Sequence, residues 1–289
     1  MSAPTETVTF WYGCNAVRHG DILRASIALL EAIGVEVRPA GGPAYCCGTA
    51  KDGNLRAAAG MAHRAVDNFN ALGHDVVTWC PSCHRHMTNF IEHYTQPRFE
   101  LNHITQRLHA HRDILRARIA AHAATHPPSP RRAMVHQHIG FHEVDVNRLV
   151  RDLLALVPGL ELVDASDAAP GHMCSALAAV PAAANEAAGT MSRRAREQAV
   201  DHVITIWHSC HRMLCALEAT EPFRIVNYVT VLAAAMGLQL TDEYQRWKLS
   251  ESDDAIVAAV GPERVRRIGE TVFRTEVLPE LARGRPPTR

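Results

Sequence analysis

Hydrophobic positions along the first third of the chain change between a strand period and a helix period. The segment 7–11 is rich in β-branched and aromatic residues, and 22–33 places apolar residues three and four positions apart. Short apolar runs at 35–37 and 75–79 flank a second helical pattern over 54–72. The order strand, helix, strand, helix, strand predicts a parallel sheet with helices on its faces.

A proline-rich segment then interrupts the pattern. The run His126-Pro127-Pro128-Ser129-Pro130 can neither continue a helix nor enter a central strand, because proline has no backbone N–H to donate. We predict a linker over 125–132, between an N-terminal domain at 1–124 and a C-terminal domain with a helical tail at 133–289. The chain length of 289 residues suits two domains.

The same order of elements recurs after the linker, at an offset near 127 residues. Cys47 and Cys83 are 36 positions apart, and so are Cys174 and Cys210. Ser82-Cys83-His84-Arg85 is matched by Ser209-Cys210-His211-Arg212. This internal duplication predicts an α/β fold of two similar halves, each a small parallel sheet flanked by helices.

The composition argues against several classes of protein. Thirty Lys and Arg balance 30 Asp and Glu, which argues against a dedicated nucleic-acid or membrane-surface binder. The apolar stretch 229–240 is shorter than the roughly 20 residues that span a bilayer, and 1–14 shows no secretory signal. We therefore expect a cytoplasmic protein without a membrane span. In that compartment, eight cysteines indicate metal or redox chemistry rather than disulfides.

Five cysteines of the first half share one predicted location, the edge of the sheet where its strands end. They are Cys14, Cys46, Cys47, Cys80 and Cys83. Single cysteines are often merely buried, but a vicinal pair plus a C-x-x-C motif at converging strand ends has no packing reason. Five soft sulfur ligands exceed the four of tetrahedral zinc and favour an iron–sulfur cluster. Gly48 is expected to let the backbone approach inorganic sulfide.

These cysteines, with Gly48, resemble the cysteine-rich CCG domain. That domain occurs twice in the catalytic B subunit of heterodisulfide reductase and in its relatives, which include the sulfur-oxidising heterodisulfide-reductase-like complex and iron–sulfur subunits of glycolate and lactate oxidation. The resemblance extends over the chain through the duplication, 99–105 and 245–248. It implies one noncubane [4Fe-4S] cluster, bound by the five cysteines, that handles disulfide or thiol substrates.

The second half departs from this pattern. At the five corresponding positions it has Phe141, or a residue within about two of it, followed by Met173, Cys174, Trp207 and Cys210. Ser175 replaces Gly48. Only two cysteines remain at these positions, so the resemblance implies no second cluster.

Three interpretations apply to the remaining side chains of the second half. These are Cys174, Cys210 and Cys215, with His138, His142, His172, His208 and His211. In the first interpretation they form a zinc site, since zinc accepts Cys and His together. In the second, Cys174 and Cys210 act catalytically, as a redox pair or as a substrate anchor facing the cluster. In the third, the site is a remnant kept only for the fold. His84 and His211, each directly after a motif cysteine, are candidate proton donors.

The electron source must lie outside the chain, because the sequence contains no ferredoxin-type cysteine run and no glycine-rich nucleotide motif. We expect a ferredoxin-like partner subunit, and the resemblance adds a flavin subunit. We expect an oxidoreductase subunit of a heterodisulfide-reductase-like complex that takes part in sulfur oxidation. It would be active only within that complex, and its substrate would be a thiol, a disulfide or carrier-bound sulfur. The alternatives are the iron–sulfur subunit of a glycolate or lactate oxidase, and a zinc-binding scaffold without a redox role.

Overall fold

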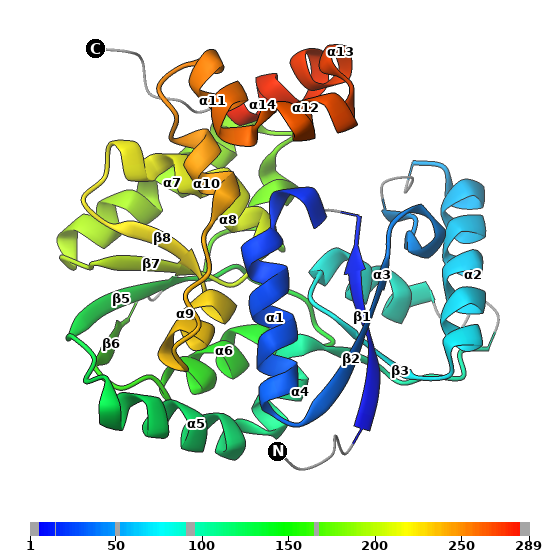
Figure 1. Cartoon of the computed structure of the whole chain (residues 1–289), viewed down its shortest axis with the longest axis horizontal. Coiled ribbons are helices and arrows are strands. Elements are labelled where there is room, and N and C mark those ends of the chain that lie inside the picture. Colours follow the sequence, from blue (N-terminus) through cyan, green and yellow to red (C-terminus); the bar gives the residue numbers. More distant parts are fainter. Residues whose placement is uncertain (1–5, 15, 50–52, 91–95, 165–167, 284–289) are drawn as a thin grey trace.

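The computed structural model describes residues 6–14, 16–49, 53–90, 96–164 and 168–283. Two four-stranded parallel sheets organise the chain (Figure 1). The first has the order β2-β1-β3-β4, from β1 (Glu6–Gly13), β2 (Val35–Gly41), β3 (Asp75–Thr78) and β4 (Leu101–His103). The second has the order β6-β5-β7-β8, from β5 (Arg131–His136), β6 (Leu160–Val163), β7 (His202–Thr205) and β8 (Arg224–Asn227). The α/β class and the two similar halves are confirmed.

Helices flank both sheets. Those of the first half are η1 (Ala16–Arg18), α1 (Gly20–Ala32), η2 (Pro43–Tyr45), α2 (Leu55–Leu72), α3 (Pro81–Phe90), α4 (Ile104–Ala110) and α5 (Arg112–Thr125). Those of the second half are α6 (Val146–Leu154), η5 (Cys174–Leu177), α7 (Pro181–Glu197), α8 (His208–Leu214), η6 (Cys215–Ala219) and α9 (Tyr228–Ala235). The predicted helix over 54–72 corresponds to α2, which Asn54 caps by accepting from the Ala57 N–H and which ends at the left-handed Gly73.

The two halves pack against each other through four helices. Helix α1 contacts α9, and α4 contacts α6. In each half, one of these helices follows the first strand and the other follows the last strand. The crosswise contacts are therefore those expected of a duplicated fold with a pseudo-twofold axis between its halves, and Figure 1 shows these helices lying between the two sheets.

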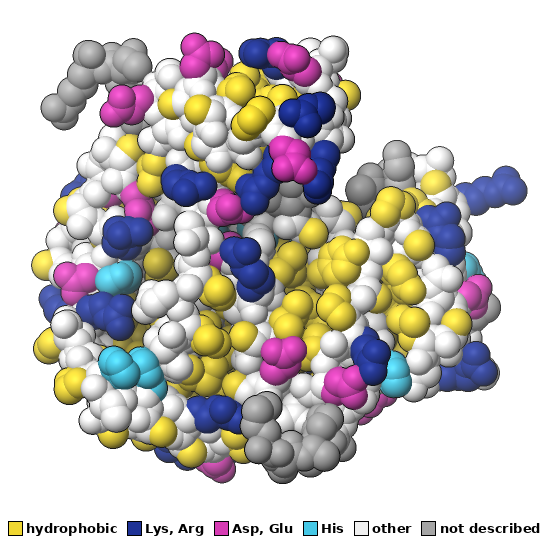
Figure 2. Space-filling view, viewed as in Figure 1, with side chains coloured by type: hydrophobic (Ala, Val, Ile, Leu, Met, Phe, Trp, Pro, Cys, Tyr) yellow, Lys and Arg dark blue, Asp and Glu magenta, His cyan; other side chains and the backbone are white. Residues whose placement is uncertain are grey.

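The segment between the halves is short. Helix α5 ends at Thr125 and β5 begins at Arg131, so the predicted linker 125–132 shares its first residue with a helix and its last two with a strand. Figure 2 shows acidic and basic side chains mixed over one face of the molecule, in keeping with the balanced charge. Within the described ranges, no helix is both long and apolar enough to cross a membrane.

A helical tail follows the second sheet. Its elements are α10 (Glu243–Lys248), α11 (Asp253–Val260), α12 (Pro262–Ile268), α13 (Glu270–Val272), the π-helical turn η7 (Phe273–Val277) and α14 (Leu278–Ala282). The tail has its own small core, which includes Cys215, Trp247 and Phe273. Glu280 ties it back to the first half, because its carboxylate accepts from the Arg18 guanidinium at 2.7 Å.

Candidate metal centres

The first candidate centre lies at the edge of the first sheet where its strands end. Cys14 follows β1 directly, Cys46 and Cys47 follow η2 after β2, and Cys80 precedes α3, whose first turn contains Cys83. Cys14 is exposed, Cys46 is half-buried and the other three are buried. Three loops that are far apart in sequence thus bring the five thiols to one place, as parallel strand ends do.

Contacts between the thiols show that they form one group. Hydrogen bonds from Cys46 and Cys83 lower the pKa of Cys47, and the Thr49 hydroxyl lies 3.0 Å from the Cys47 sulfur. The pKa of Cys83 is raised, because its thiol proton is held in the bond to Cys47 and because it is buried beside Cys80. Burial, then the nearby Cys80 and Cys47, raises the pKa of Cys14. The structure therefore brings together all five predicted residues.

Two tryptophans hold these loops in register. The indole of Trp11 donates to the Tyr45 carbonyl at 2.9 Å, which fixes the loop leading to Cys46 against β1. The indole of Trp79 donates to the Tyr12 carbonyl at 3.0 Å, which fixes the end of β3 in the same way. Both loops are positioned by buried side chains rather than by the thiols themselves.

The structure gives a reason for a glycine at position 48 other than the predicted approach of the backbone to inorganic sulfide. Its φ is +87°, and a Cβ there would lie 2.5 Å from the Ala58 carbonyl oxygen and 2.9 Å from the Ala58 Cα. The glycine therefore lets the vicinal pair lie against the backbone of α2. The glycine that lies next to a sulfur is Gly13, where a Cβ would lie at contact distance, 3.6 Å, from the Cys83 sulfur.

The donor set fits an iron–sulfur cluster. Five soft sulfur atoms lie at one edge of a sheet, partly open to solvent at Cys14, and thiol protons are already shared within the group. All five side chains are candidate ligands.

The second candidate centre occupies the equivalent edge of the second sheet. In the strand register, His136 pairs with Thr205 in the second sheet, and Trp11 pairs with Thr78 in the first. His136 therefore corresponds to Trp11, and His138, two residues later, corresponds to Gly13. Ile139 then corresponds to Cys14, within the two-residue window predicted around Phe141. The ligand atoms of His136, His138, Cys174 and Cys210 all lie within 4.8 Å of one another.

This second group is deeply buried and hydrogen-bonded. Its four side chains are between 0% and 6% exposed. The Nε2 atoms of His136 and His138 lie 3.2 and 3.3 Å from the Cys174 sulfur, and the Cys174 N–H donates to the Cys210 sulfur at 3.3 Å. A bond with Cys210, then bonds with both histidines, lowers the pKa of Cys174 to about 3. The catalytic role of Cys174 and Cys210, as a redox pair or substrate anchor, stays a prediction.

His136 was not among the side chains considered in the sequence interpretation. It ends an apolar strand, where a single histidine resembles a core residue. The available signal was the His136-x-His138 pair directly after a strand, at the same strand end where the first half places Cys14.

The other predicted side chains of the second half lie elsewhere. His142 is exposed, His172 stacks on Phe141, His208 packs against Trp79, and Cys215 belongs to the core of the tail. Burial lowers the pKa of His211, but its bond to Asp242 and the charges of Asp242, Asp21 and Glu218 together raise the pKa above its usual value.

His84 and His211 differ in environment, although each follows a motif cysteine. Burial lowers the pKa of His84, whose Nδ1 lies 3.5 Å from the Thr88 hydroxyl. His211 instead lies in a cluster with Asp21 and Asp242. Their roles as proton donors stay predictions.

Side chains at or near the positions of the missing cysteines in the second half contact the first half. The Ser82 hydroxyl, between Cys80 and Cys83, lies 4.0 Å from the Met173 sulfur. The Arg85 guanidinium lies 5.7 Å from the Phe141 ring centroid. Trp207, 1% exposed, packs edge-on against His103 at the end of β4. The two strand-end edges therefore meet, with an apolar layer of the second half against the cysteine loops of the first.

Residues 8–88 match the family model of the CCG cysteine-rich domain. The match contains all five cysteines of the first centre and supports iron–sulfur or metal binding by this half. No curated protein matches the chain.

Proposed function

We propose that this protein is the iron–sulfur subunit of a heterodisulfide-reductase-like complex, handling disulfide and thiol groups at one noncubane [4Fe-4S] cluster in sulfur oxidation. The observation that carries the proposal is the convergence of five thiols from three loops within the CCG match. The equivalent edge of the second half holds two thiols and two imidazoles, which supports a single cluster.

The five cysteines of the first centre would hold the cluster, which supplies single-electron transfer and iron for a substrate sulfur. Cys14 is exposed, so an incoming sulfur compound approaches from its side. Arg18 places a positive charge near Cys14 and lowers its pKa against the effect of burial. On the other side, the buried Met173 places its sulfur 4.0 Å from the hydroxyl of Ser82, which lies between Cys80 and Cys83.

A partner must deliver or remove the electrons. Each of the eight cysteines belongs to one of three groups: five lie in the first centre, two lie in the second, and Cys215 lies in the core of the tail. No thiols are left for a relay cluster. This accounting supports a ferredoxin-like partner subunit, together with a flavin subunit, in the same complex.

Metal analysis of the protein purified without oxygen tests the proposal. We expect a brown protein with iron and acid-labile sulfide in equal amounts, and a change in its EPR signal when a thiol or disulfide is added. Cys47→Ser should lose most of the iron, because a hard hydroxyl replaces a soft thiolate. Cys215→Ser is the matched control and should keep it. A colourless wild-type protein with zinc in the first centre would favour the scaffold alternative and overturn the proposal.

A further inference from the structure

We propose that His136, His138, Cys174 and Cys210 form a tetrahedral site for one zinc ion or a similar divalent cation. The site lies in the second half, outside the CCG match, and does not depend on the function proposed for the first centre. Four potential ligands converge from three segments: the end of β5 and the residues after it, η5, and α8.

The distances are those of a mononuclear site. Zinc bonds of about 2.3 Å to sulfur and 2.0–2.1 Å to nitrogen place tetrahedral ligand atoms roughly 3.3–3.8 Å apart. The two histidine Nε2 atoms lie 3.2 and 3.3 Å from the Cys174 sulfur, and all four ligand atoms lie within 4.8 Å of one another. One ion fits at their centre with small adjustments of the side chains.

The space around these ligands suits an ion and not a cluster. In the first half, Gly13 places no side chain at this position, where a Cβ would lie at contact distance, 3.6 Å, from the Cys83 sulfur. In the second half, His138 stands at the equivalent strand position, and its imidazole reaches the Cys174 sulfur. The histidine thus fills the equivalent region and supplies a ligand atom there.

Hydrogen bonds around the site orient its ligands. The Nδ1 of His138 lies 3.0 Å from the Pro170 carbonyl; an N–H there would donate to that oxygen and leave the Nε2 lone pair toward Cys174. The Asn147 amide donates to the His138 carbonyl at 2.7 Å, and the Ala169 N–H donates to the Gln137 carbonyl at 2.9 Å. Backbone and side-chain bonds therefore fix the ligand loops, as second-shell groups do at metal sites.

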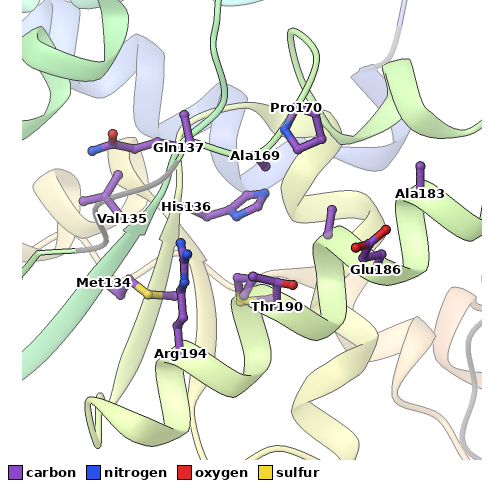
Figure 3. A pocket seen from close by; sticks show the side chains of 13 residues that line it. Met134, Val135, His136, Gln137, Ala169, Pro170, Ala183, Glu186, Thr190 and Arg194 are labelled. Carbon is purple, nitrogen blue, oxygen red and sulfur yellow. The ribbon is translucent and has the colours of Figure 1, made fainter.

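An access route lies beside the ligand His136. A cavity of about 260 Å³ separates the end of β5 from α7 and includes His136, Glu186 and Arg194 in its wall. Figure 3 shows the His136 ring pointing into this cavity, across from the side chains of α7. With four protein ligands the coordination is closed, so the ion holds the edge of the second sheet together and is not a catalytic metal.

Metal content of the full-length protein, purified without oxygen from zinc-supplemented medium, tests this site. We expect about one zinc per chain in the wild type, loss of that zinc in Cys174→Ser and His138→Ala, and retention of it in Cys47→Ser. His142→Ala, which changes an exposed histidine close in sequence, is the matched control and should keep the zinc.

Cobalt gives a second measurement that does not depend on activity. Cobalt bound in place of zinc should show the visible absorption of a tetrahedral ion with thiolate ligands, lost in His136→Gln. Unchanged iron content in the variants shows that the chain has folded and separates this test from that of the first centre. Zinc unchanged in both Cys174→Ser and His138→Ala, or its absence from the wild type together with no tetrahedral cobalt spectrum, would overturn the proposal.

Discussion

The two strand-end edges of this molecule share a framework and differ in their chemistry. Each lies at the end of a four-stranded parallel sheet of the same order, and each places a cysteine in the helix after the third strand. The first edge gathers five thiols, one of them exposed. The second gathers two thiols and two imidazoles, all buried.

Few positions account for this difference. Cys14, Cys46 and Cys80 of the first half correspond to Ile139, Met173 and Trp207 of the second, which removes three thiols and puts apolar side chains in their place. Gly13 corresponds to His138, which fills space and adds a nitrogen. A duplicated sheet thus keeps the loop positions while side-chain exchange sets which metal the edge is suited to bind.

We predict the largest effect on stability and on bound iron for a substitution of Gly48 at the first edge. Gly48→Ala forces a Cβ to within 2.5 Å of the Ala58 carbonyl at a φ of +87°, and we expect destabilisation of about 3 kcal/mol or more with loss of most bound iron. Ser175, its counterpart, is not among the positive-φ residues of the described chain, so the second edge has no such requirement. Denaturant unfolding and iron analysis provide the measurement.

Gly53→Ala is the matched control for this change. Nothing lies within 4 Å of a Cβ built at Gly53, so stability and iron should stay near wild type. Full stability and iron in Gly48→Ala would show that the close approach to α2 is not needed.

The next effect concerns removal of the ion from the second edge. A strong zinc chelator should lower the melting temperature of the wild-type protein by roughly 5–10 °C, because ion binding to the folded state adds a few kcal/mol of stability. In Cys174→Ser the chelator should cause no shift. An equal shift in both proteins would assign the stabilising ion to another place.

The smallest predicted effect is on the pH dependence of stability, and it concerns an aspartate in the helix that follows the first strand of the first half. Asp21 in α1 is 5% exposed, whereas Asp145 at the start of α6 is exposed and caps its helix. Burial, then the charge of Asp242, raises the pKa of Asp21 from 3.8 to about 6. A carboxyl whose pKa is raised by folding contributes stability below its unfolded pKa and loses it as pH rises through the folded value.

We therefore expect wild-type stability to fall, relative to Asp21→Asn, between about pH 4 and pH 7. The difference should grow by about 2 kcal/mol over this pH range, since the pKa rises from 3.8 to about 6 and each pKa unit corresponds to about 1.4 kcal/mol. Urea unfolding at several pH values measures it. Parallel profiles for wild type and Asp21→Asn would contradict the prediction.

The sequence predicted the parts of this molecule that depend on local periodicity. Strand and helix patterns located β1, α1, β2, α2 and β3, and the rule that parallel strand ends meet was enough to gather Cys14 with Cys80. The role of Gly48 was not predictable in this way, because its contact at Ala58 lies in a helix whose approach depends on tertiary packing.

The second centre was predicted only in part for a similar reason. Cys174, Cys210 and His138 were among the residues considered, but His136 is the last residue of a strand and follows three apolar residues. Cys215 is five positions from Cys210 in sequence and belongs to a different core, which only the packing of the tail determines.

The bond between Arg18 and Glu280 has a consequence for the order of events during synthesis. These partners are 262 positions apart, and Arg18 lies just after Cys14. At about 5–20 residues per second, the ribosome needs roughly 10–50 s to reach Glu280 after Arg18 has been made. The loop of Cys14 therefore lacks this anchor throughout translation of the second half. We expect stable occupancy of the first centre to begin only after the helical tail has emerged and folded.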